Sequence, residues 1–129
     1  MNIQDYLKSL NSHFKRDIST ELTFRGDLQR LLESLVPQVK VTNEPRRIGC
    51  GAPDYVITHR DIPVGYIEAK DIDTDLKAKQ YREQFDRYRN ALDNLIITDY
   101  LTFVLYKEGE FVTSVQIGKV QNKKIITSF

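Results

Sequence analysis

Two short segments of this chain place acids and a lysine at spacings suited to holding a divalent cation. Gly51-Ala-Pro-Asp54 puts an acid directly after a proline, and Tyr66-Ile-Glu-Ala-Lys70 carries Glu68 and Lys70 two positions apart. Alternate residues of a strand point to the same face, so Glu68 and Lys70 can point into one site. Asp54 can join them if the strand that follows it pairs with theirs.

These residue types suit metal-assisted cleavage of a phosphodiester. Asp54 and Glu68 could ligate Mg²⁺, for which Mn²⁺ could substitute, with the backbone carbonyl of Ala69 as a further oxygen ligand. Such a metal lowers the pKa of its water and neutralises charge on a phosphate, while Lys70 would position or activate that water. In a purely structural interpretation, Asp54 only begins a strand and Glu68–Lys70 is a surface ion pair, because motifs this short recur by chance.

Glu21 is a further candidate because it falls on the apolar side of a predicted helix. On a helical wheel it shares one sector with Arg25 and with the leucines Leu28, Leu32 and Leu35. A carboxylate that faces a core is costly unless a cation or hydrogen bonds satisfy it, so Glu21 could serve the site. The alternative is a first-turn acid favoured by the helix dipole, bonded only to Arg25.

Gln84 and Tyr88 lie one turn apart on the helix predicted to follow Lys70. Tyr88 belongs to the apolar stripe of that helix and Gln84 lies at its edge, so both can face the sheet. A glutamine amide there could hydrogen-bond a phosphate or a water of the metal. The alternatives are a solvated boundary residue for Gln84 and core packing for Tyr88, with its hydroxyl at the rim of the site.

Basic residues surround these positions, although acidic neighbours dilute them. On a helix such charges are usually its solvated face, but they could also contact phosphates without reading sequence. The histidines have no zinc-ligand spacing to another His or Cys, and Cys50 has no partner motif. These basic positions are Arg46, Arg47, His59, Arg60, Lys77, Lys79, Arg82, Arg87 and Arg89.

The composition is that of an ordinary globular domain. The length of 129 residues predicts one domain, and 40% hydrophobic with 29% charged residues is typical of such domains. The net charge of +1 means that any nucleic-acid surface must be local. The single cysteine excludes an internal disulfide and favours a cytoplasmic location, and the sequence has neither a membrane-spanning stretch nor the features of a signal peptide.

Hydrophobic periodicity predicts two helices, three strands, a helix and three more strands. We therefore expect an α/β (α+β) fold in which helices flank a central mixed β-sheet. The last two strands should form a hairpin around residues 107–110. The expected helices span residues 3–14, 21–36 and 75–92, and the expected strands span 39–41, 54–58, 64–70, 95–98, 102–106 and 111–117.

Together these motifs resemble the PD-(D/E)xK nuclease superfamily. Glu21, Gly51-Ala-Pro-Asp54, Glu68-Ala-Lys70 and Gln84 with Tyr88 follow in the order of that superfamily. The resemblance is closest to the Mrr-like N-terminal nuclease domain of single-chain, type ISP-like restriction-modification enzymes, and it covers most of the chain. The runs that recur there stand here as Thr20-Glu-Leu-Thr-Phe-Arg25, Thr42-Asn-Glu-Pro45 and Tyr66-Ile-Glu-Ala-Lys-Asp71.

That resemblance implies a restriction-endonuclease-like αβββαβ core and an Mg²⁺-dependent DNA endonuclease. It carries Asp54, Glu68 and Lys70 over as catalytic positions, with Glu21 and Gln84 assisting at positions that vary more within the family. Residues 1–129 would be a single nuclease domain, either excised from a larger restriction-modification polypeptide or a small stand-alone relative.

The implied partners are DNA and further domains of the same polypeptide, namely a translocase, a methyltransferase and a target-recognition domain. Double-strand cleavage generally needs two active sites, so dimerisation on DNA is also expected. Two alternatives remain open. One is a non-catalytic nucleic-acid-binding or assembly module with a nuclease fold, and the other is a nuclease acting on branched DNA or RNA.

Overall fold

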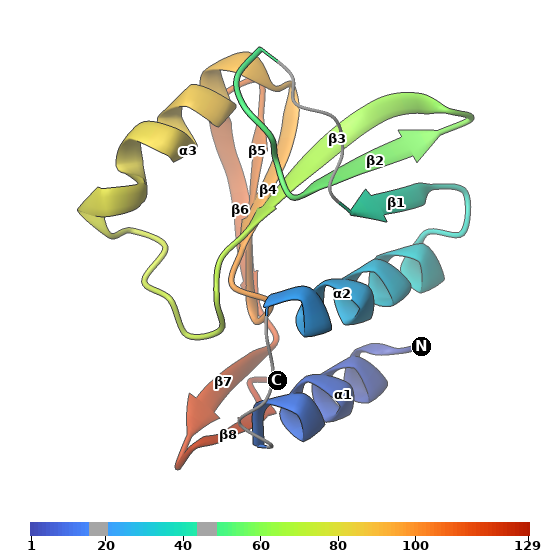
Figure 1. The fold of residues 1–129 in the computed structure, drawn as a ribbon, viewed down its shortest axis with the longest axis vertical. Helices are drawn as coiled ribbons and strands as arrows, with labels where there is room; N and C mark the ends of the chain where they lie inside the picture. Colours follow the sequence, from blue (N-terminus) through green and yellow to red (C-terminus); the bar gives the residue numbers. More distant parts are fainter. Residues whose placement is uncertain (16–20, 44–48) are drawn as a thin grey trace.

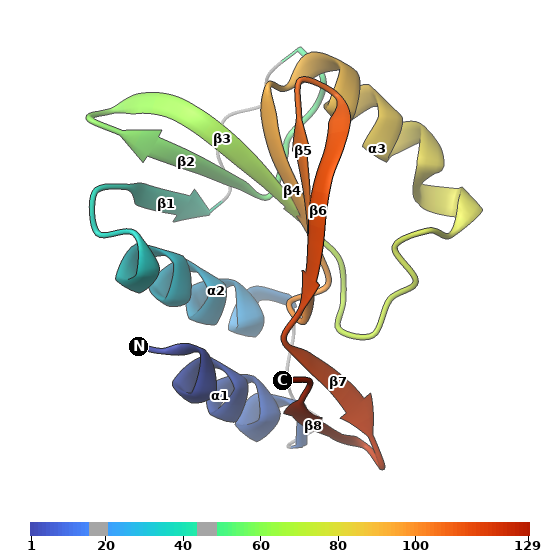
Figure 2. The ribbon, with the colours of Figure 1, turned by 180° about the vertical axis from the view of Figure 1, so that it is seen from behind.

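Helices cover both faces of a central six-stranded sheet in the computed structural model of the protein (Figures 1 and 2). The structure describes residues 1–15, 21–43 and 49–129, apart from the side chains of residues 15 and 21–23. The elements are α1 (Ile3–Lys15), α2 (Glu21–Leu35), β1 (Lys40–Asn43), β2 (Tyr55–His59), β3 (Ile62–Ala69), α3 (Lys79–Ala91), β4 (Asn94–Thr98), β5 (Thr102–Lys107), β6 (Glu110–Gln116), β7 (Gly118–Gln121) and β8 (Lys124–Thr127).

The sheet has the strand order β1-β2-β3-β4-β5-β6. All neighbouring strands are antiparallel except β3 and β4, which are parallel. Parallel neighbours need a crossover connection, and α3 is the helix in that crossover. The predicted mixed sheet flanked by helices is therefore confirmed, and α2-β1-β2-β3-α3-β4 has the αβββαβ order.

Each face of the sheet packs into its own hydrophobic core. On one face α1 and α2 bury residues such as Tyr6, Leu28 and Ile67. On the other face α3 packs Phe85 against Leu95 and neighbouring residues of the sheet. Strand alternation sends Ile67 and Ala69 into the first core and leaves Glu68 on the side of α3.

The helix α3 begins at Lys79 rather than at the predicted residue 75. Two turns precede it, closed by the hydrogen bonds from Thr74 N to Asp71 O and from Ala78 N to Asp75 O. Ala78 is extended at φ −62° and ψ 142°. This backbone conformation is incompatible with a helix that runs on from residue 75.

A small second sheet, formed by β7 and β8, was not predicted from the sequence. It packs beside α1, where Ile125 N donates to the side-chain oxygen of Asn11 at 2.9 Å. Ile117 and Ile125 join the first core. Figure 1 shows this hairpin beside α1, below the main sheet. It extends the first core without contributing to the residues around Asp54.

The helix α2 buries most of its predicted stripe, but not the end of it. Leu28 is buried and Leu32 packs against the first core, whereas Leu35 is 54% exposed. The acidic side chain of Asp27, which was not predicted to face the core, is fully buried. Asp27 accepts a hydrogen bond from Ser9 Oγ at 2.7 Å, lies 3.1 Å from His13 Nδ1 and pairs with Arg30. This cluster joins α2 to α1.

Within the described residues, no helix is long and apolar enough to cross a membrane.

Candidate active site

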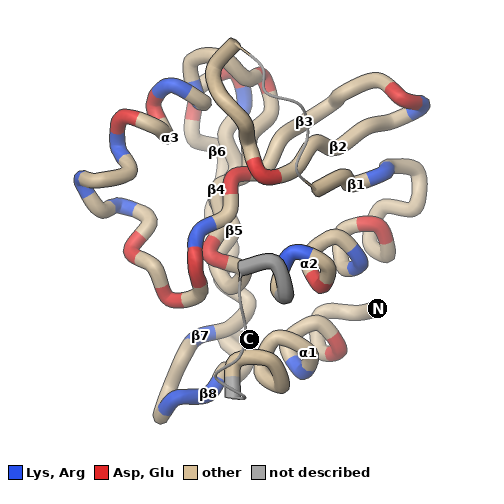
Figure 3. The backbone as a smooth tube through the Cα atoms, viewed as in Figure 1, with Lys and Arg blue, Asp and Glu red and all other residues tan. Residues whose placement is uncertain are grey.

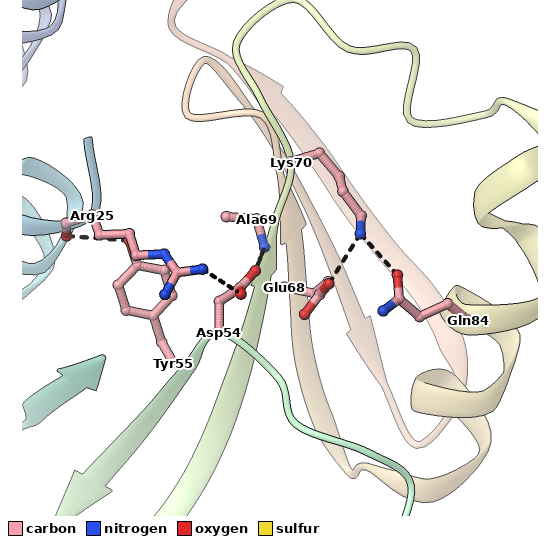
Figure 4. Close-up of polar contacts among 7 residues, drawn as sticks. All are labelled: Arg25, Asp54, Tyr55, Glu68, Ala69, Lys70 and Gln84. Carbon is pink, nitrogen blue, oxygen red and sulfur yellow. Dashed lines mark hydrogen bonds and ion pairs between the residues drawn. The ribbon is translucent and has the colours of Figure 1, made fainter. Parts of the chain in front are cut away.

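The pairing of β2 with β3 brings Asp54 beside Glu68. Tyr55 is opposite Ile67 in the antiparallel register, so the residue before Tyr55 meets the end of β3. Asp54 Oδ2 accepts a hydrogen bond from the backbone N–H of Ala69 at 2.8 Å (Figure 4). The strand that follows Asp54 therefore pairs with the strand of Glu68, as predicted.

A tight glycine turn delivers Asp54 to this position. Gly51 has a φ of 131°, a conformation that residues with a Cβ rarely adopt. A Cβ at residue 51 would also lie 3.0 Å from the hydroxyl oxygen of Tyr88. Pro53 is fully buried between this turn and β2. The turn therefore packs against α3 and holds the carboxylate that follows it.

Glu68, Lys70 and Gln84 form a second group on the side of α3. Lys70 Nζ donates to Glu68 Oε2 at 3.2 Å and to the amide oxygen of Gln84 at 2.8 Å (Figure 4). The ammonium also lies 4.9 Å from the ring centroid of Tyr81, within the range of a cation–π interaction. Glu68 and Lys70 share a face as predicted, and Gln84 points toward the sheet.

Glu68 is in an environment that disfavours its negative charge. Burial and the nearby charge of Asp54 together raise its pKa to about 7, while Lys70 opposes the shift. Its Oε1 atom is buried and has no hydrogen-bond partner among the described residues. A buried carboxylate oxygen without a partner is costly, and a bound cation would remove that cost.

Arg25 links α2 to the same group of residues. Its Nη2 donates to Asp54 Oδ1 at 2.9 Å, and its backbone carbonyl accepts a hydrogen bond from the Tyr55 hydroxyl at 3.1 Å. From the sequence, Arg25 was predicted only as a possible partner for Glu21. Its contact with Asp54 depends on how α2 packs against the sheet, which no local pattern indicates.

The donor set fits a magnesium ion. Its oxygen donors are the Asp54 and Glu68 carboxylates and the carbonyl of Ala69, and Mg²⁺ is commonly held by one or two carboxylates together with waters and phosphate. No group of three or more His, Cys, Asp or Glu residues arranged for a metal occurs in the described part of the chain. Glu21 begins α2, but its side chain is outside the described residues, so its predicted role stays a prediction.

Tyr88 lies behind this group, within the second core. It is 2% exposed, and burial together with the charge of Glu68 raises its pKa. The helix α3 carries both basic and acidic residues (Figure 3). Arg87 pairs with Glu83 at 2.6 Å, and Arg89 lies 3.5 Å from Asp86. Arg46 and Arg47 lie outside the described residues.

Comparison with known proteins finds similarity at the level of the fold. No family model and no curated protein match this chain. Seven chains of solved structures match it, among them one in a cryo-EM structure of a DrdV–DNA complex. That match has a TM-score of 0.68 and 23% sequence identity, and covers 88% of this chain but 12% of the DrdV chain. This protein therefore shares its fold with a small part of a much longer protein solved together with DNA.

Proposed function

We propose that this chain is a metal-dependent DNA endonuclease domain of the PD-(D/E)xK type and the cleavage module of a restriction-modification enzyme. The observation that carries the proposal is the convergence of Asp54, Glu68, Lys70 and Gln84 at the end of β3. DNA is the proposed substrate because the matching fold occurs in a DrdV–DNA complex. Further domains and dimerisation on DNA belong to the same proposal.

Asp54 and Glu68 would hold Mg²⁺, with the carbonyl of Ala69 as a further ligand. When bound there, Mg²⁺ supplies charge neutralisation at the phosphate and makes water a better nucleophile. The buried Glu68 Oε1 supports this assignment. It has no hydrogen-bond partner among the described residues, and a bound cation would supply a partner.

Lys70 would act on the attacking water and on the charge that develops at the phosphate. Its Nζ is held between Glu68 and Gln84, so the ammonium has a fixed position before substrate binds. A donor oriented in advance stabilises developing negative charge without reorganising during the reaction.

One observation favours a second candidate, a non-catalytic DNA-binding module with the same fold. Arg25 and the Ala69 N–H already engage the two carboxylate oxygens of Asp54. In a domain that never binds metal, these two contacts alone would satisfy the Asp54 carboxylate. Mg²⁺ binding therefore separates the two candidates.

The experiment combines calorimetry with Mg²⁺ and cleavage of a supercoiled plasmid, using wild type, Asp54→Asn and Asp86→Asn. Asp86 is an exposed acid on α3 and serves as the control. We expect wild type and Asp86→Asn to bind Mg²⁺ and cleave, and Asp54→Asn to lose binding and to cleave about a hundredfold more slowly. Full cleavage by Asp54→Asn would overturn the site, and Mg²⁺ binding without cleavage would favour a module that needs partner domains.

A further inference from the structure

A guanidinium group lies on the carboxylate that is proposed to hold the metal. Arg25 Nη2 is 2.9 Å from Asp54 Oδ1, and the two side chains are only 13% and 15% exposed. Figure 4 shows Arg25 reaching the carboxylate from α2, on the side opposite Glu68 and Lys70. Arginine keeps its charge at all physiological pH values, so this contact is an ion pair in a largely dry position.

The fold fixes the position of the Arg25 backbone, from which the guanidinium extends to Asp54. The Tyr55 hydroxyl donates to the backbone carbonyl of Arg25, which ties the helix to β2 beside Asp54. Two residues further on, the buried Asp27 joins α2 to Ser9 and His13 of α1. Arg25 is therefore held at the site by its helix, unlike a long surface side chain that meets an acid by chance.

Each of the two carboxylates has a cation from the protein beside it. Lys70 lies 3.2 Å from Glu68, and Arg25 lies 2.9 Å from Asp54. In the absence of a metal, these cations reduce the repulsion between two acids that are close enough for Asp54 to raise the pKa of Glu68. Lys70 has a proposed role in cleavage, whereas the proposed cleavage reaction assigns no role to Arg25.

We propose that Arg25 is a positioning residue that holds Asp54 in the metal-free protein and competes with the divalent cation for that carboxylate. This inference rests on the proposed function, because it requires Asp54 to be a metal ligand. It predicts two effects of opposite sign when the guanidinium is removed. The metal-free protein should become less stable, and its affinity for Mg²⁺ should increase.

The test compares Arg25→Met with Arg30→Met in the absence of DNA. Arg30 lies on the same helix and pairs with Asp27, so its loss breaks an ion pair without touching Asp54. Calorimetry should show that Arg25→Met binds Mg²⁺ about tenfold more tightly than wild type, since an adjacent cation shifts the binding of a second cation to a carboxylate by about this factor. Arg30→Met should bind Mg²⁺ as wild type does.

Thermal unfolding gives a second readout, which is how the difference in melting temperature between variant and wild type depends on Mg²⁺. A merely structural role of Arg25 would leave this difference the same with and without Mg²⁺. In EDTA, Arg25→Met should melt below wild type. At an Mg²⁺ concentration well above both Kd values this gap should narrow, because a tighter ligand stabilises the folded state more. The gap between wild type and Arg30→Met should stay the same in both conditions.

The outcomes separate this inference from the proposed function. If wild type binds Mg²⁺ and Arg25→Met binds it equally or more weakly, Arg25 has only a structural role and the inference is overturned. If wild type binds no Mg²⁺, the proposed metal site itself is wrong and the inference is overturned with it. Should Arg25→Met fail to fold, Arg25→Gln keeps a hydrogen-bond donor without the charge and must show the same tightening.

Discussion

The ammonium of Lys70, just past the end of β3, lies 2.8 Å from the amide oxygen of Gln84 on α3. Fourteen positions separate the two residues, and the turns between Asp71 and Ala78 bring the helix back over the sheet. The contact matters because Lys70 also donates to Glu68, so one side chain of α3 fixes the position of the lysine relative to the buried acid.

Replacing Gln84 by alanine should slow cleavage while metal binding changes little. Without the amide oxygen, Lys70 loses one of the two side-chain hydrogen bonds that it makes to described residues, and loss of an orienting partner typically costs about tenfold in rate. Single-turnover cleavage of plasmid DNA at saturating Mg²⁺ measures this effect. Gln80→Ala, one turn earlier on an exposed position, is the matched control and should cleave at the wild-type rate.

The metal-free protein should lose stability as the pH rises from about 4.5 to about 7. Glu68 binds its proton more tightly in the folded state, where its pKa is about 7, than at its ordinary value of 4.5. Stability due to this group is complete below pH 4.5 and is lost as the pH passes through 7. Its size should be on the order of 3 kcal/mol in the free energy of unfolding.

Urea unfolding in EDTA at a series of pH values measures this dependence. Glu68→Gln cannot ionise, so the fall in stability across that range should be smaller in the variant than in wild type. Equal pH dependence in the two proteins would show that Glu68 is not the group responsible.

Gly51→Ala should destabilise the protein and reduce cleavage together. The substitution forces a Cβ into a positive φ and against the Tyr88 hydroxyl, at an expected cost of about 1–3 kcal/mol in the free energy of unfolding. Because Asp54 follows this turn directly, its position should shift as well. Gly49→Ala is a suitable comparison, since a Cβ there meets nothing within 4 Å, and its unfolding curve should match that of wild type.

Asp27→Ala should be among the more destabilising single changes in the chain. It removes a fully buried carboxylate and leaves Ser9, His13 and Arg30 without their shared partner, at a cost of about 3 kcal/mol. Chemical denaturation measures this loss, with the exposed Asp86→Asn expected to lie within about 0.5 kcal/mol of wild type. An Asp27→Ala protein as stable as wild type would contradict the proposed role of the cluster in joining α1 and α2.

Local patterns were sufficient to predict the faces of β3 and α3. The period of two along β3 placed Glu68 and Lys70 together and Ile67 in a core, because side-chain direction in a strand is set by the backbone alone. The order of elements as far as β6 followed from the same kind of pattern. Gln84 was predicted at the edge of a helical stripe and lies there, facing Lys70.

Contacts between elements could not be predicted in this way. Arg25 meets Asp54 across 29 positions, and the helical wheel of α2 contains no information about which residue of the sheet it will face. The same wheel placed Leu35 on the buried side and missed Asp27, whose burial depends on partners in α1. The hairpin of β7 and β8, with strands of four residues each, was also missed, and its place beside α1 depends on contacts between elements.

The central claim is that Asp54, Glu68 and Lys70 form a metal-dependent site that cleaves DNA. The most direct test is the conversion of supercoiled plasmid to nicked or linear DNA by wild type and by Lys70→Met, in saturating Mg²⁺ and in EDTA. We predict cleavage by wild type in Mg²⁺ only, and a rate for Lys70→Met lower by about a hundredfold or more. Cleavage that persists in EDTA, or that proceeds at the wild-type rate without the lysine, would contradict the claim.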